Sequence, residues 1–395
     1  MPHIAYNPYS ETVQADPWPV YRRLRDDAPA YFIEELDAWA LSRFDDVWQA
    51  SMNRDAYTAT RGTSPGVLLL DRAPQPAVFL FMDPPEHRQH RDLISGAYLR
   101  ESVAQLEERI RALTRARLQP QLGRGELDVH ALATQVAIGT IADFIGLPHA
   151  DIEHIRALID IFYHREPGLA GTTPAGLQAF MEARTFILQR IERCRAQPPA
   201  APTHLRTWLD AMIDGSAMSD ENIYFSIFAL AITGSDTVPL NTAGSVYYLA
   251  RHPEQLAQVR ADPTLIPHAF AETARFDQPT NILGRTLTRD IELHGRTLRK
   301  DQSVLFLFAS ANRDEREFDD PDRFDIHRRS RRTLSFGAGL HVCLGQHLAR
   351  LEGRIILEEL LAAIPDFDVD FERCRRVFGE FLQGWCQVPI RFRPR

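Results

Sequence analysis

Residues 336–345 read Phe-Gly-Ala-Gly-Leu-His-Val-Cys-Leu-Gly, and this stretch decides most of what the chain can be. It places Cys343 in a glycine-bearing loop directly before a helical pattern at 346–361. Unpaired backbone N–H groups at a helix start favour negative charge, which lowers the pKa of a cysteine there. A thiolate in that setting is a good metal ligand, so the sequence predicts a cysteine-ligated site at this loop.

The loop also carries three glycines. Gly337, Gly339 and Gly345 are expected to adopt backbone conformations closed to other residues and to leave room for a flat cofactor. A buried cysteine in a turn would be the commoner explanation of an isolated Cys-x-Gly. A structural zinc site is not supported, because zinc takes four ligands and only His341 and Cys343 are present here.

The same string is similar, at every fixed position, to the heme loop Phe-Gly-x-Gly-x-His-x-Cys-x-Gly of the cytochrome P-450 family. The resemblance implies heme b as the cofactor and Cys343 as the axial thiolate ligand of its iron. Phe336 would shield the thiolate, and Gly337 and Gly345 would lie against the heme. The implied fold is mainly α with a small β lobe, a triangular helical prism around a buried heme.

Composition limits the class of protein, the partners and the location that we expect. The chain has 395 residues, 44% of them hydrophobic, which is enough for a large core, and its net charge of −8 argues against a nucleic-acid partner. Four cysteines without disulfide-like spacing fit a reducing cytoplasm: Cys194, Cys343, Cys374 and Cys386. Residues 1–8 contain no apolar signal core or anchor. We therefore expect a cytoplasmic monomer with no membrane partner.

Strand patterns are concentrated in two β-rich parts, near 30–45 and 280–310. Hairpins are expected at 30–34 with 38–42 and at 290–293 with 297–298, and an apolar strand at 304–308. Helical patterns cover 103–118, 129–145, 152–162 and 177–194. The proline-bearing stretch 197–203 could be a linker, but the pattern after it continues unchanged. We interpret it as a surface loop, and residues 1–395 as a single domain.

A long apolar helix is predicted at 222–250, with Asp236 as its one charged residue. Polar residues in its middle favour a buried central helix over a membrane span. Its segment 233–237, Thr-Gly-Ser-Asp-Thr, resembles the family's oxygen-activation motif Ala-Gly-x-Asp-Thr. Reducing dioxygen consumes protons, so the resemblance implies catalytic roles for Asp236 as a carboxylate relay and Thr237 as a hydroxyl.

Four residues in or just after this segment bear on the shape of the helix. Gly234 is expected to loosen the helix, and the Thr237 hydroxyl to bond into the turn and open a groove. Thr233 replaces the common alanine, and Pro239 removes a backbone donor, which should deepen the kink. We expect neither departure to abolish oxygen activation.

Other motifs follow in the family's order. Glu272 and Arg275 reproduce Glu-x-x-Arg, three residues apart on one helical face, and Arg323 in the meander would complete their network. Four side chains are implied as donors to the heme propionates: His87, Arg91, Arg285 and His341. Six residues are candidates for an apolar substrate pocket: Leu230, Thr233, Ile282, Leu283, Phe381 and Leu382.

The resemblance implies a monooxygenase that inserts one atom of O2 into a small, largely apolar molecule by hydroxylation, demethylation or epoxidation. Electrons would come from a separate acidic ferredoxin and its reductase. Four arginines just ahead of the heme loop could form its docking patch: Arg328, Arg329, Arg331 and Arg332, although Arg328 could instead serve the heme or the Glu272 network. Two alternatives stay open, a peroxide-driven peroxygenase or other heme-thiolate enzyme, and a non-catalytic heme sensor. The pair Asp236 and Thr237 argues against both.

Overall fold

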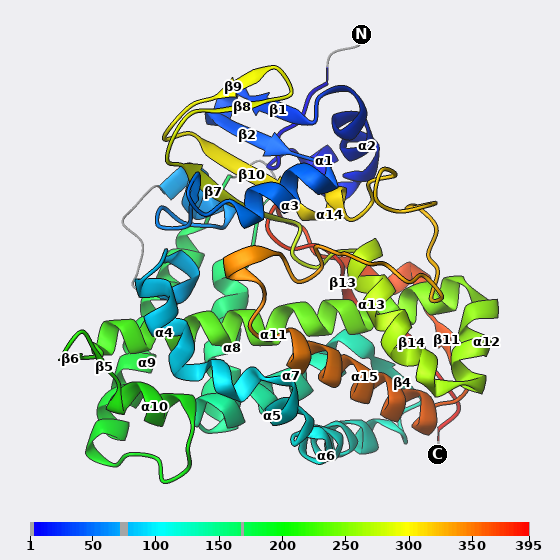
Figure 1. Cartoon of the computed structure of the whole chain (residues 1–395). Coiled ribbons are helices and arrows are strands. Elements are labelled where there is room, and N and C mark those ends of the chain that lie inside the picture. Colours follow the sequence, from blue (N-terminus) through cyan, green and yellow to red (C-terminus); the bar gives the residue numbers. More distant parts are fainter. Residues whose placement is uncertain (1–3, 72–77, 167–169, 395) are drawn as a thin grey trace.

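The computed structural model describes residues 4–71, 78–166 and 170–394; residues 1–3 of the N-terminal stretch considered above lie outside them. The β lobe is built around a five-stranded mixed sheet, drawn at the top of Figure 1. Its strand order is β1 (Ala30–Ile33), β2 (Ala38–Leu41), β10 (Ser303–Leu307), β7 (Ile282–Leu287) and β3 (Tyr57–Thr58). β2 and β10 are parallel and the other pairs antiparallel. The predicted hairpin at 30–42 and the strand near 304–308 are confirmed.

Strand alternation divides this sheet into two apolar faces. Val304 and Phe306 of β10 pack into one buried cluster, whereas Leu305 and Leu307 pack into another with Tyr21 of α2. Successive side chains of a strand point to opposite faces, so a strand buried on both sides reads as a continuous apolar run. The second predicted hairpin is also confirmed, as β8 (Ile291–Leu293) with β9 (Arg296–Leu298).

The helical part fills the rest of the molecule (Figure 1). Its longer helices are α2 (Trp18–Asp27), α3 (Phe44–Met52), α4 (Glu86–Ser95), α6 (Glu107–Leu118), α7 (Val129–Ile145), α8 (His149–Tyr163), α9 (Pro174–Ala196), α11 (Asp220–Arg251), α12 (Pro253–Ala261), α13 (Ile266–Phe276) and α15 (Gln346–Ala363). The shorter ones are α1 (Glu11–Ala15), α5 (Arg100–Ala104), α10 (His204–Asp210), α14 (Phe308–Ala311) and a π-helical turn, Gly66–Asp71. Small sheets join β4 (Glu126–Asp128), β14 (Pro389–Arg391) and β11 (Asp368–Val369), β12 (Arg375–Arg376) and β13 (Trp385–Gln387), and β5 (Met212–Ile213) and β6 (Ser216–Ala217).

The helix predictions hold with one correction. The pattern at 103–118 is broken, because α5 ends at Ala104 and α6 begins at Glu107. Two hydrogen bonds between residues i+3 and i, from Gln105 N to Ser102 O and from Leu106 N to Val103 O, form a turn there in place of α-helical bonds. The proline-bearing stretch 197–203 is the connection between α9 and α10, as expected of a loop.

Helix α11 runs through the middle of the helical part and packs against α7, α8, α9, α13 and α15 (Figure 1). It is long and apolar enough to cross a membrane by composition, but 67% of its most apolar window is buried inside the protein. The backbone is helical throughout, including Pro239. Gly234 is needed for packing, since a Cβ there would lie 2.4 Å from Cγ1 of Ile141 on α7. The expected loosening at Gly234 is therefore replaced by a close helix contact.

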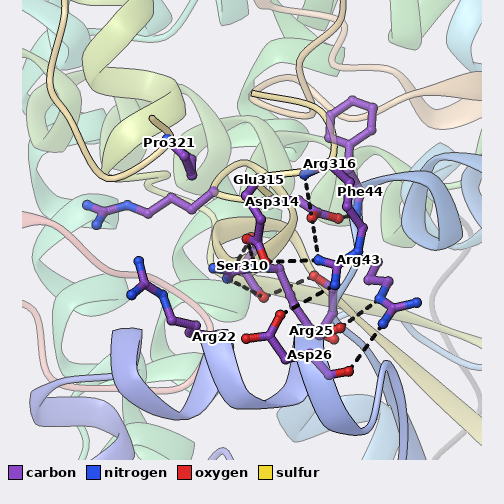
Figure 2. Close-up of polar contacts among 12 residues, drawn as sticks. Arg22, Arg25, Asp26, Arg43, Phe44, Ser310, Asp314, Glu315, Arg316 and Pro321 are labelled. Carbon is purple, nitrogen blue, oxygen red and sulfur yellow. Dashed lines mark hydrogen bonds and ion pairs between the residues drawn. The ribbon is translucent and has the colours of Figure 1, made fainter. Parts of the chain in front are cut away.

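Hydrogen bonds and ion pairs of charged side chains connect α2 and α3 to residues 310–316. Figure 2 shows Arg25 of α2, only 2% exposed, donating through Nη1 to the carbonyl and the hydroxyl of Ser310, both at 3.2 Å. Asp314 accepts a hydrogen bond from Phe44 N at 2.9 Å and so caps α3. Arg316 pairs with both Asp314 and Asp26 in the same view.

A second paired network lies on α13. Arg275 donates to both carboxylate oxygens of Glu272, at 2.7 and 2.8 Å, and Arg328 Nε lies 3.2 Å from the same carboxylate. The prediction that Arg323 completes this network is wrong: its side chain is exposed, and only its carbonyl accepts a bond from Arg275. A turn closed by Arg323 N and Asp320 O precedes Arg328, which reaches back over Glu272.

Candidate functional site

The loop before α15 is a tight turn held by its own backbone. Gly337 and Gly339 have φ of 69° and 70°, a left-handed conformation that favours glycine, and Cys343 N donates to Phe336 O at 2.8 Å. A Cβ at Gly339 would lie 2.3 Å from the carbonyl oxygen of Ser51, so glycine lets the loop pack on α3. These two glycines behave as the sequence predicts.

Gly345 corrects the prediction. Its φ is −82°, which any residue can adopt, so no special backbone conformation requires glycine there. It forms the N-cap of α15, faces the cavity described below, and an added Cβ would meet no atom within 4 Å. Glycine here leaves open space beside Cys343.

The Cys343 thiol sits at the start of α15 with its exposed surface turned into that cavity. Burial raises the pKa of the Cys343 thiol, while a backbone hydrogen bond from Gly345 and the charges of Arg91 and Arg350 lower it. The net direction is upward, opposite to the expectation from the helix start alone. The groups that favour a thiolate are in place, but in this protein environment burial outweighs them.

A cavity of about 270 Å3, open to solvent on one side, lies between this loop, α11, α4, β7 and the turn at 381–382. Nearly all of the residues predicted for the site line it: Arg91, Leu230, Thr233, Asp236, Thr237, Leu283, Arg285, Phe336, Gly337, His341, Cys343, Gly345, Phe381 and Leu382. Residues more than 100 positions apart are thus brought together around one hollow.

Ile282 is the exception among the pocket candidates. It is 1% exposed and packs in the apolar cluster on the far face of the sheet, with Tyr21 and Leu305. Neighbouring residues of a strand point to opposite faces, so Leu283 can line the cavity only if Ile282 turns away from it. The prediction that both residues line the pocket is therefore wrong for Ile282.

Four nitrogen-bearing side chains, His87, Arg91, Arg285 and His341, gather at one end of the cavity, and none of them makes an ion pair among the described residues. The rings of His87 and His341 are 4.6 Å apart, and Arg91 Nη2 donates to Val342 O at 2.7 Å. Arg285 donates only to the carbonyl of Gly284. Both ring nitrogens of buried His87 lack a hydrogen-bond partner among the described residues. Buried donors are normally paired, so this cluster fits an anionic ligand.

The pKa values of these groups reflect their crowding. Burial, followed by the charges of Arg285, His87 and Arg91, lowers the pKa of His341 to about 2. Burial and then Arg91 lower the pKa of His87 to about 4, and burial lowers the pKa of Arg285 to about 10. Burial disfavours the charged form of each group, and cationic neighbours add to this for His87 and His341, whereas Asp83 opposes it for Arg285. A dianion bound here would favour the charged forms.

Across the cavity, Asp236 is buried and its carboxylate is paired with Arg156 of α8, a partner that the sequence analysis missed. Burial raises the pKa of Asp236 to about 6, and Arg156 opposes that rise. Its other oxygen, Oδ2, has no hydrogen-bond partner among the described residues. Arg156 lies between the buried residues Ile155 and Leu158 and also pairs with Asp160 one turn later, so the sequence alone is explained by an ordinary helix ion pair and gives no signal for the contact with Asp236.

The bond into the turn expected of the Thr237 hydroxyl is not found among the described residues; Thr233 Oγ1 donates to Ala229 O at 2.9 Å instead, and Ser235 donates to Ala231 O. Thr237 is half-buried and lines the cavity next to Asp236.

Glu352 is a second residue that the sequence analysis missed. It lies on α15, lines the cavity, is 2% exposed, and its Oε1 has no partner among the described residues. Burial raises the pKa of Glu352 to about 8. The residue lies four positions after Leu348 and four before Ile356, both buried, so a carboxylate inside the apolar stripe was the available signal.

These observations test whether heme fits the site. Cys343 lines the cavity, Gly345 leaves room next to it, and the guanidinium groups of Arg91 and Arg285, which make no ion pair among the described residues, could bind two carboxylates. An aromatic ring, Phe336, lies beside the loop with the Arg350 guanidinium 4.2 Å from its centre. The donor set and the cradle fit an iron porphyrin with two propionates.

Comparison with known proteins gives the same answer over the whole chain. The sequence model of the family described as cytochrome P450 (written P-450 here) matches residues 169–372. The protein named cytochrome P-450 123 of Mycobacterium tuberculosis H37Rv is 36% identical over 402 residues, covering 100% of this chain and 98% of that protein. CYP199A2 of Rhodopseudomonas palustris is 28% identical over 100% of this chain and 95% of its own length.

Solved structures agree. CYP109E1 from Bacillus megaterium, in complex with testosterone, matches with a TM-score of 0.87 at 25% identity, covering 97% of this chain and 99% of that one. The similarity therefore includes the β lobe and the helical part as well as the cysteine loop.

Proposed function

Because the chain belongs to the cytochrome P-450 family, whose members are heme-thiolate monooxygenases, we propose that it inserts one oxygen atom from O2 into a small, largely apolar molecule. The observation that carries this proposal is the single cavity that joins Cys343, the unpaired cationic cluster and the Asp236–Thr237 pair. One face of the cavity can hold a cofactor, and the opposite face can handle protons.

Heme b, the family's cofactor, supplies the iron at which dioxygen is bound and reduced. We propose that Cys343 ligates this iron and that Phe336 shields its sulfur. His87, Arg91, Arg285 and His341 would bind the propionates by charge-assisted hydrogen bonds. Among the described residues, the ring nitrogens of His87 have no hydrogen-bond partner and Arg285 makes no ion pair, which supports these roles.

Protons would be managed by the residues of α11. Asp236 has a pKa of about 6, near the value that suits a group that takes up and releases protons at neutral pH. We propose that the Asp236 carboxylate exchanges protons with solvent when Arg156 moves aside, and that the Thr237 hydroxyl donates the hydrogen bond that directs a proton to dioxygen. The ion pair to Arg156 supports a gate on this route.

The substrate would lie between α11, β7 and the turn at 381–382. Leu230, Thr233, Leu283, Phe381 and Leu382 line this part of the cavity, so its surface is apolar except for the Thr233 hydroxyl. The testosterone complex of CYP109E1 supports an apolar substrate of this kind. We propose a terpenoid, steroid or aromatic molecule, oxidised in a single cytoplasmic domain.

The electron donor is proposed to be an acidic ferredoxin that docks on the cysteine side. Two of the four candidate arginines are already used by the chain itself. Arg328 is bound to Glu272, and Arg332 pairs with Glu317 and Asp45. Arg329 and Arg331 are exposed and make no ion pair among the described residues, so they are the better candidates for docking.

The experiment that tests the function compares turnover with NADH, reductase and ferredoxin against turnover with hydrogen peroxide alone. We expect NADH-driven oxidation, with Thr237→Ala diverting electrons to hydrogen peroxide while substrate binding stays near normal. Cys343→His should remove the carbon-monoxide difference band from which the family takes its number. Product formed only with peroxide would favour a peroxygenase, and no product in either assay would favour a sensor.

A further inference from the structure

The turn between β12 and β13 carries two residues into the substrate cavity. Phe381 and Leu382 line the hollow, and their backbone is tied to the chain just before β7. Asn281 N donates to Phe381 O at 2.9 Å, and Gln383 N donates to Pro279 O at 2.9 Å. These bonds hold one side of the turn but leave its other side to be positioned by side chains.

Glu380, directly before Phe381, supplies that second attachment. Its side chain is 2% exposed, and its Oε2 lies 3.4 Å from Nε of Arg165, whose side chain is 8% exposed. Neither carboxylate oxygen makes a hydrogen bond to another described residue. Arg165 is itself held at the end of α8, because its Nη1 donates to the carbonyls of Phe162 and His164.

Aromatic rings surround this ion pair. Tyr163 stacks on Phe381 with ring centres 5.8 Å apart, and the Arg165 guanidinium lies 5.7 Å from the Tyr163 ring centre. Burial and then the Glu380 charge raise the pKa of the Tyr9 phenol, which shows that the carboxylate lies close to the N-terminal segment. The pair therefore fastens the Phe381 turn to α8 in a largely apolar setting.

A buried ion pair adds little net stability, because desolvation of both charges offsets their attraction. Removal of one partner is costly, because the other charge is left uncompensated, so the pair strongly prefers one geometry. We propose that Arg165 and Glu380 are positioning residues that hold Phe381 and Leu382 against the substrate. This inference deepens the monooxygenase function proposed above, since it assigns the residues that set the fit of the small, largely apolar substrate.

The first test measures amide hydrogen exchange in the holoenzyme. Glu380→Gln should speed exchange in peptides that cover 377–385, because the turn loses one of its two attachments. Asp151→Asn is the matched control: it breaks the Asp151–Arg190 pair at the other end of α8, where Arg190 Nε lies 2.7 Å from the carboxylate. The control should leave exchange in the turn unchanged.

The second test uses azoles that bind the heme iron and extend into the cavity. Glu380→Gln should weaken 1-octylimidazole by about fivefold, since its chain must now order the turn on binding. Imidazole itself, which is too short to reach the turn, should bind within about twofold of the wild-type affinity. Both affinities are read from the shift of the heme absorption band.

A double variant separates positioning from folding stability. Arg165→Met with Glu380→Gln removes both charges, so its unfolding midpoint should return toward wild type while turn exchange stays fast and 1-octylimidazole stays weak. Recovery of slow exchange and tight binding in the double variant would overturn the proposal, as would unchanged exchange in Glu380→Gln. None of these measurements needs turnover, so failure of the monooxygenase assay would not be confused with failure of this inference.

Discussion

Two buried clusters of cationic side chains in this protein differ in one respect. Around α13, Arg275 and Arg328 face the carboxylate of Glu272, and Arg275 also donates to the carbonyls of Asn312 and Pro321. Around the cavity, Arg91 and Arg285 make no ion pair with a described carboxylate, although the charge of Asp83 still acts on Arg285. A protein that buries a charge normally supplies its partner.

The contrast separates scaffold from binding site. The α13 cluster is complete in the chain alone, and it joins the meander to the helical part, as does the network of Figure 2. The cavity cluster is incomplete until an anion enters. Mutations should therefore act on folding in the first cluster and on cofactor retention in the second.

The largest effect is expected in the paired cluster. Arg275→Leu should lower the free energy of unfolding by about 3–5 kcal/mol, because it leaves the carboxylate of Glu272 buried without its main partner. Urea unfolding measures this loss. Arg323→Leu is the matched control and should cost almost nothing, since that side chain is exposed. Equal losses of unfolding free energy in Arg275→Leu and Arg323→Leu would contradict the distinction between a scaffold cluster and a binding cluster.

The pH dependence of stability is expected to report on Glu352, whose buried Oε1 has no partner among the described residues. Its pKa of about 8 lies above that of an unfolded glutamate near 4.5, so the folded protein holds the proton more tightly. Stability from this group is present at low pH and is lost as pH rises from 4.5 toward 8. Glu352→Gln should flatten that dependence and stabilise the protein at pH 8 by on the order of 2 kcal/mol. Exposed Glu108→Gln should keep the wild-type slope.

Arg285→Leu tests most directly whether the cavity cluster serves cofactor retention rather than folding. We expect apoprotein stability to be unchanged or higher, because a buried cation without a partner is removed, while heme is lost about tenfold faster. Transfer of heme to apomyoglobin gives the rate, and urea unfolding gives the stability. A destabilised apoprotein with normal heme retention would place Arg285 with the scaffold.

The smallest effect concerns the arginines ahead of the heme loop. Arg331→Glu should slow reduction by ferredoxin about threefold at low salt, with the difference vanishing as salt screens the charges. Arg332→Glu should instead lose its pairs with Glu317 and Asp45 and lower the unfolding midpoint. Unchanged reduction by Arg331→Glu at every salt concentration would exclude it from docking.

Much of the site could be predicted because its residues lie in short continuous motifs. The loop 336–345, the segment 233–237 and the pair His87 and Arg91 each depend on spacing within one turn or helix. Local backbone geometry converts such spacing into a shared face, whatever the rest of the chain does. The same reason explains why most helices and both hairpins were placed correctly.

What only the tertiary structure decided are the partners across elements. The amino-acid sequence by itself determined the family, the cysteine loop and the segment 233–237. It offered both Arg323 and Arg328 for the Glu272 network, and only the structure shows that Arg328 reaches Glu272. It could not show that Arg156 of α8 meets Asp236, or that Ile282 faces away from the cavity. Contacts between residues far apart in sequence depend on which faces the helices and strands bury against one another. No local spacing encodes that choice, because it is settled by packing of the whole core.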